Sequence, residues 1–225
     1  MAIASGAQAQ QAAVPEGCAA VMTVQTRGCT VQHRLICEDL APGDFRLALY
    51  GPGGPFLIGH YNRHYQTLAS VIVPTQKITR SLDAGPDPLN MDELLDDGLD
   101  TYDFTEVEER PGSGPVEVRM MGFDRLTGDT IEIDGRSLLV TEFEYRRIGP
   151  DGEVMEHFAG QQFVDPDFLT IYAGTFIDKT GGSEPNDLSP VKFYGPDDPG
   201  FLSAVPRHDC PATDASFSLP SEQDQ

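Results

Sequence analysis

Residues 137–164 read SLLVTEFEYRRIGPDGEVMEHFAGQQFV, and this stretch decides the fold class. Two runs rich in β-branched and aromatic residues flank the turn sequence GPDGE, so the stretch predicts two neighbouring antiparallel strands. Further strand-like runs lie on both sides: VEVRMMGF and TIEIDG before it, and FLTIYAGTFI after it. The turn sequences RLTGD, DGR and DPD separate these runs, which predicts a five-stranded meander from residue 115. Gly160 and Gly174 fall inside strand-like runs, where glycine often marks a bend or bulge.

The strand pattern continues upstream of the meander. DFRLALYG at 44–51 alternates in the manner of a half-buried strand, and residues 56–59 and 68–73 are also strand-like. Residues 75–89, a polar run with two prolines, are predicted to be an internal connection. Downstream, 178–190 is predicted to be a loop, and VKFYG a last strand.

One short helix is expected, at about 91–97. Asn90 is a suitable N-cap, Glu93 occupies the capping-box position, and Gly98 supplies a left-handed stop. The fold class is therefore mostly β: a single curved antiparallel sheet, a meander resembling half a barrel, with this helix laid on it and disulfides as staples.

Four cysteines occur, Cys18, Cys29, Cys37 and Cys210. No two are spaced as a zinc site or a C-x-x-C redox motif requires, so no metal site is predicted. A hairpin with a two-residue turn at Arg27-Gly28 places Cys18 opposite Cys37 and leaves Cys29 for Cys210. Four cysteines allow three connectivities, and this register favours Cys18–Cys37 with Cys29–Cys210.

The predicted disulfides indicate an oxidising compartment. Ala7-Gln8-Ala9 has the form of a signal-peptidase cleavage site, although the charged and apolar regions of a signal peptide are missing. We expect residues 1–17 to be a signal-peptide remnant or disordered, 18–210 to form one domain, and 211–225 to be a disordered acidic tail. The expected location is periplasmic or secreted, and no apolar run is long enough for a membrane span.

The formal charge of −21, from 36 acids against 15 bases, excludes a nucleic-acid-binding footprint. HYNRH at 60–64 offers two histidines, but in a strand they lie too far apart for one metal ion. The segment is instead predicted to be an edge strand with Tyr61 and Tyr65 packed inward. Asp96, Asp97, Asp100 and Asp103 lack the order of a calcium loop and are expected to form a solvated acidic helix end. No catalytic motif and no cofactor motif occurs, which disfavours an enzyme.

Three segments, DELLDDGLDTYDF, GFDRLTGDTIEIDG and SPVKFYGPDDPGFLSAVPRHDC, resemble parts of uncharacterised exported proteins of alphaproteobacteria. The resemblance covers most of 90–210, and that family has no assigned activity to carry over. The meander is also similar, in pattern alone, to the half-barrels of periplasmic lipoprotein carriers, which is a weak basis for function.

Two functions are open. The first is a non-enzymatic binding or carrier protein that holds an apolar ligand on the concave face of the sheet. Its candidate ligand-binding residues are Phe143, Tyr145, Phe158 and Tyr172, from an aromatic supply larger than a thin sheet readily buries. The second is a cell-envelope module that binds a protein partner and no small molecule. A cavity of several hundred Å³ favours the first, and a filled core with an exposed apolar patch favours the second.

Overall fold

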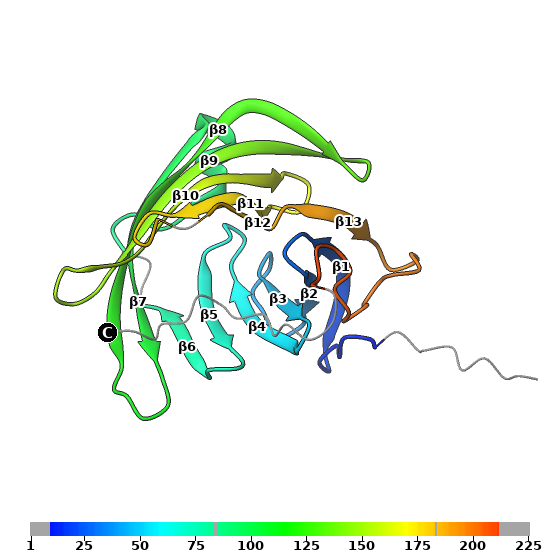
Figure 1. Cartoon of the computed structure of the whole chain (residues 1–225), viewed down its shortest axis with the longest axis horizontal. Coiled ribbons are helices and arrows are strands. Elements are labelled where there is room, and N and C mark those ends of the chain that lie inside the picture. The colour runs from blue at the N-terminus through cyan, green and yellow to red at the C-terminus, as the bar shows by residue number, and fades with distance from the viewer. Residues whose placement is uncertain (1–9, 83–84, 183, 212–225) are drawn as a thin grey trace, which may run out of the picture.

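The protein is one continuous antiparallel sheet with a single short helix, seen in a computed structural model that describes residues 10–82, 85–182 and 184–211 (Figure 1). The elements in chain order are β1 (Cys18–Thr26), β2 (Thr30–Cys37), β3 (Phe45–Gly51), β4 (Gly54–Tyr61), β5 (Thr67–Ile72), β6 (Lys77–Ser81), α1 (Met91–Asp97), β7 (Leu99–Glu109), β8 (Val116–Ile133), β9 (Arg136–Ile148), β10 (Val154–Asp165), β11 (Thr170–Asp178), β12 (Asn186–Asp187) and β13 (Pro190–Tyr194). The predicted fold class is confirmed.

The sheet curls so far that its two ends are brought together. Its strand order is β12-β11-β10-β9-β8-β7-β6-β5-β4-β3-β2-β1-β13, and β12 and β13 are consecutive in the chain. The Leu188 N–H donates to the Gly174 carbonyl, while Ser189 O accepts from the Arg27 N–H. Residues 186–194 thus pair with β11 at one end and with β1 at the other, and the sheet surrounds a concave interior (Figure 1).

The β1–β2 hairpin carries the first disulfide, in a register that differs from the prediction at its tip. The predicted two-residue turn is wrong: Thr26 pairs with Thr30 across a three-residue loop, 27–29. A register shift between Ala20 and Met22 then restores the expected pairing of Cys18 with Cys37. The bulge takes up the extra loop residue, so the predicted disulfide survives a wrong turn.

Both predicted disulfides are confirmed, Cys18–Cys37 and Cys29–Cys210. The second bond ties the loop between β1 and β2 to the last described residues. Residues 202–207 run over the outer face of β1, where Leu202 N–H donates to Thr23 Oγ1 and Arg207 N–H donates to Gln25 Oε1. We call residues 202–210 the C-terminal strap. Of the predicted tail, 212–225 lie outside the described residues, as do 1–9 at the N-terminus.

Two further predictions about connections are wrong. Residues 77–81, inside the predicted connection 75–89, form β6, which pairs with β5 and β7. RLTGD is an irregularity within the long strand β8, where the register shifts between Leu126 and Thr130. At β6, pairing on two sides overrides the local turn chemistry, because a strand in mid-sheet satisfies its backbone groups from both neighbours. In RLTGD, residues 127–129 have no strand partner among the described residues, so the turn-like sequence forms a bulge and does not end the strand.

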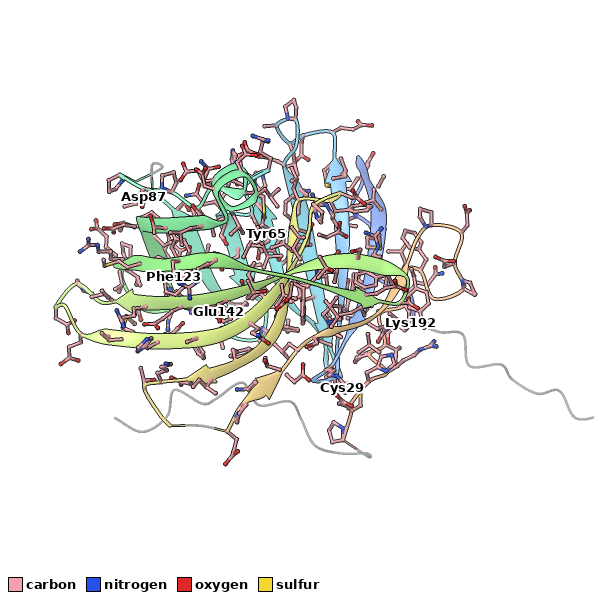
Figure 2. All side chains as sticks on the ribbon, turned by 90° about the horizontal axis from the view of Figure 1, so that it is seen from above. Cys29, Tyr65, Asp87, Phe123, Glu142 and Lys192 are labelled. Atoms are coloured by element: carbon pink, nitrogen blue, oxygen red, sulfur yellow. A yellow bond between two sulfur atoms is a disulfide. The ribbon has the colours of Figure 1, made fainter. Side chains whose placement is uncertain are left out.

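The helix α1 closes one end of the curled sheet, beside Tyr65 (Figure 2). Asn90 Oδ1 accepts from the Asp92 N–H, and Gly98 ends the helix in the left-handed conformation, as predicted. Met91 and Leu94 are buried against Val164 and Ile171. At roughly 1.5–3 kcal/mol per buried side chain, these contacts anchor a helix too short to be stable alone.

Candidate functional site: the concave face

A ladder of aromatic rings crosses the concave face from β9 to β11. The ring centres of Phe143 and Tyr145 are 6.0 Å apart, those of Tyr145 and Phe158 5.5 Å, and those of Phe158 and Phe176 5.7 Å. Tyr145, Phe158 and Phe176 are partly exposed, whereas Phe143 is buried. The structure therefore brings three of the four predicted ligand-binding residues into one ladder.

Two glycines let the rings lie close to the backbone. A Cβ at position 122 would lie 2.7 Å from the Tyr102 ring, and one at position 160 would lie 2.1 Å from the Thr175 carbonyl oxygen. The register also shifts between Gly160 and Gln162, so the expected irregularity at Gly160 is confirmed. Gly122 therefore leaves room for the Tyr102 ring, and Gly160 lets the backbone of β11 approach β10 closely.

The ladder faces the enclosed space. Burial raises the pKa of Tyr145 above its usual value, and the Glu156 and Glu106 carboxylates of β10 and β7 add to the shift. Burial likewise raises the pKa of Tyr61, on β4, to about 12, with a smaller contribution from the same Glu106. Side chains from β4, β7 and β9 therefore meet inside the curl of the sheet.

Tyr172, the fourth predicted ligand-binding residue, lies elsewhere. Its ring meets Phe193 edge-on at 5.4 Å, and it packs in a core with Met22, Val24, Leu138 and Phe163. Only 3% of Tyr172 is exposed. Tyr172 does not join the ladder, because the register shift between Gly160 and Gln162 inserts an extra residue into β11. Tyr172 and Phe176 therefore lie on opposite faces of the sheet.

A buried ion network lies on the same concave face. Arg147 binds Glu108, with Glu156 2.8 Å away and Glu106 3.7 Å away, and Lys77 donates to Glu108 at 3.1 Å. Burial raises the pKa of Glu106. Burial acts in the same direction on Glu108, but Arg147 and Lys77 outweigh it and hold the pKa of Glu108 below its usual value. The network keeps charge inside the curl only because each member has a partner.

A pair of carboxyl groups lies deeper, next to α1. Asp100 and Asp124 are direct cross-strand partners and are 0% and 3% exposed. Asp100 Oδ2 accepts from the Asn90 N–H at 3.0 Å, while Oδ1 has no hydrogen-bond partner among the described residues. Burial raises the pKa of each to about 7. Nearby acids raise these pKa values further: Asp100 acts on Asp124, and Glu93 and Asp87 act on Asp100. The predicted solvated position of Asp100 is therefore wrong.

Replacing Asp124 with asparagine should flatten the dependence of stability on pH. A carboxyl group whose pKa is raised from 3.8 to about 7 holds its proton in the folded state and loses it when unfolded. Its penalty is absent below pH 4, grows between pH 4 and 7, and levels off above pH 7, where the folded state also loses the proton. Between pH 4 and 8 the variant should gain roughly 2–4 kcal/mol relative to the parent chain, because a unit of pKa is about 1.4 kcal/mol. Urea unfolding at both pH values measures this gain, and an equal effect at both would contradict it.

The histidines of the predicted motif do not converge. His60 Nε2 lies 3.0 Å from Asp44 Oδ2, and His64 lies in the turn after β4. The predicted edge strand is wrong, because β4 pairs with β3 on one side and β5 on the other. Tyr61 and Tyr65 do pack inward, with ring centres 5.2 Å apart, as predicted. The one group of described residues with metal-like spacing, Cys18, Cys37 and Asp39, contains a disulfide, so its sulfurs are not thiolate ligands.

A cavity of about 300 Å³ lies on the outer side, under the C-terminal strap. Cys29, Cys210, Val205 and the β3–β4 turn at Pro52 are among its lining residues. Nearby, His33 is buried against Thr23, with its Nδ1 2.9 Å from Thr23 Oγ1, and burial lowers the pKa of His33 to about 4. This cavity is separate from the aromatic ladder.

No protein-family model, no curated protein and no solved structure matches this chain. Among the described residues, no helix has the length and apolar character needed to cross a membrane. A function for this protein is therefore inferred from the geometry of the concave face.

Proposed function

We propose that this protein is an exported, non-enzymatic binding or carrier protein whose concave face holds an apolar ligand. The aromatic ladder supports this proposal most directly, because Tyr145, Phe158 and Phe176 keep part of their surface exposed inside the curl. Rings in a purely structural core would be covered on every side. Export is supported by the two disulfides and by the resemblance to exported proteins.

Replacing Phe158 with alanine should weaken binding of a neutral apolar dye such as Nile red about tenfold, since the ring contributes contact area at the centre of the ladder. Phe123 provides the matched control: it lies on β8, and its place next to Gly122 puts it on the opposite face of the sheet (Figure 2). Phe123→Ala should leave the affinity unchanged. Dye fluorescence titration of both variants measures the effect.

Native mass spectrometry of the chain purified from its own host gives an independent check. A bound small molecule that is lost from Phe158→Ala and retained by Phe123→Ala supports the carrier. A parent chain that binds no dye, and that co-purifies with a protein in place of a small molecule, would replace the carrier with the envelope interaction module.

A further inference from the structure

Arg34 is a buried cation without a carboxylate partner. It lies on β2 between Met22 and Leu47 of the flanking strands and is 8% exposed. Its guanidinium carbon is 3.5 Å from the centre of the Phe45 ring, and Nη1 donates to Thr170 Oγ1. Among the described residues, this is its one hydrogen bond, and it makes no ion pair.

The charges around Arg34 do not balance. Asp165 is the one acid whose charge raises the pKa of Arg34, and burial outweighs it and lowers that pKa. The Asp165 carboxylate is occupied by Arg136 and by the backbone N–H groups of Asp167 and Phe168. Asp165 is therefore the ion-pair partner of Arg136, and Arg34 has no carboxylate of its own among the described residues, in a chain whose net charge is −21.

The other polar neighbours of Arg34 carry no charge at neutral pH. Tyr65 and Tyr172 lie beside it, and burial raises the pKa of each above its usual value. They stay protonated, so their hydroxyl groups can donate hydrogen bonds but cannot neutralise a cation. One positive charge is left unmatched.

Arg34 cannot resolve this burial as the acid pair does. Asp100 and Asp124 avoid an unmatched charge by keeping a proton, whereas a guanidinium does not lose its proton in proteins. A buried cation without a counter-ion is strongly unfavourable, and well-packed apolar side chains are often at least as stable at such positions. Arg34 therefore calls for an anion that the described chain does not supply.

We propose that Arg34 binds the oxyanion head of an amphiphilic ligand, a carboxylate or a phosphate monoester. The inference rests on the proposed carrier function and names its ligand class. Phe45 is fully buried against the guanidinium and stacks on Tyr61 at 5.5 Å, and Tyr61 stacks on Tyr65 at 5.2 Å. Tyr61 and Tyr65 keep part of their surface exposed, so these two rings offer the surface for an apolar tail. A planar guanidinium fork pairs with two oxygens of such a head, and Thr170 fixes its orientation.

Binding of four amphiphiles that share one dodecyl-length tail tests the proposal. Dodecanoate and dodecyl phosphate carry the two oxyanion heads, dodecanamide is neutral, and dodecyltrimethylammonium is cationic. Calorimetric titration of the full chain, below micelle concentrations, should show at least one oxyanion bound about tenfold or more tighter than dodecanamide. The stronger of the two oxyanions identifies the head group.

Arg34→Met should remove this preference, while Arg34→Lys should keep part of it as a point charge. The free Arg34→Met chain should melt no lower than the parent, because an unmatched cation is replaced by an apolar side chain. Arg125→Met is the control, since Arg125 pairs with Glu142 on the surface with 55% of its side chain exposed. It should change neither affinity nor melting temperature.

The outcomes separate the two proposals. If dodecanamide binds as tightly as both oxyanions, and Arg34→Met binds them with unchanged affinity, the proposed carrier function is kept and the proposed binding of an oxyanion by Arg34 is wrong. A lower melting temperature of Arg34→Met with unchanged affinities likewise assigns Arg34 to the fold alone. If none of the four amphiphiles binds the parent chain, both proposals fail.

Discussion

Replacing both Cys29 and Cys210 with alanine should lower the free energy of unfolding by about 5 kcal/mol. The bond links residues 181 positions apart, and the loop-entropy estimate grows with the logarithm of that length. Losing the Cys18–Cys37 bond, with a separation of 19, should cost about 3 kcal/mol. The hairpin already pairs those two residues, which reduces the loss further.

Guanidinium unfolding of the two double variants under non-reducing conditions measures this order. Besides the entropy term, the long bond holds the C-terminal strap, whose Val205 carbonyl accepts from Gln25 Nε2 and whose His208 carbonyl accepts from the Cys29 N–H. Proteolysis should therefore release the strap first in the Cys29/Cys210 variant. A larger loss from the Cys18/Cys37 pair would show that the strap contributes little.

Replacing Arg147 with methionine should lower the free energy of unfolding by about 3–5 kcal/mol at pH 7, because it leaves buried carboxylates without their cation. Glu106 and Glu108 are 5% and 4% exposed. Lys77 and Arg110 still pair with Glu108. Arg147, however, is the one ion-pair partner of Glu106 among the described residues. The loss should shrink as the pH falls toward 4, since both acids then take up protons in the variant. Thermal unfolding across this range measures it.

The matched control for Arg147 is Arg125, whose surface pair with Glu142 should be worth less than about 1 kcal/mol. A second variant, Arg147→Met with Glu106→Gln and Glu108→Gln, removes Arg147 together with its two buried acids and should recover part of the loss, since Lys77 then lacks Glu108. If Arg147→Met costs no more than Arg125→Met, the network is not a structural element.

Part of the candidate site could be predicted from sequence. Phe143, Tyr145 and Phe158 are predicted ligand-binding residues because the meander carries many aromatic side chains. Alternation along a strand places Phe143 and Tyr145 on one face, and pairing of β9 with β10 adds Phe158 to it. The acids were missed, although LDTYDFTEVEE carries a signal: Asp100, Glu106 and Glu108 share the spacing of two with Tyr102 and Phe104. Acids in the phase of aromatic residues indicate a polar interior.

The surroundings of Arg34 and Tyr172 could not be predicted from the sequence. Both lie in strands predicted correctly, yet the alternation of a strand assigns two faces without saying which one becomes enclosed. At position 34 the enclosed face carries a buried arginine, although arginine side chains are mostly exposed in proteins. At Tyr172, the register shift between Gly160 and Gln162 of the neighbouring strand moves the ring out of the ladder.

The sequence by itself determined the local features of this protein: the turns between β9, β10 and β11, the caps of α1 and the closeness of Cys18 and Cys37 in one hairpin. These depend on residues close along the chain or on a single hairpin, so propensity and spacing are enough. Tertiary structure alone decided that 186–194 joins the two ends of the sheet, that Asp100 meets Asp124, and that Arg34 is buried. Those outcomes depend on how far a twisted sheet curls, a sum of small twists and bulges over many strands that no single stretch encodes.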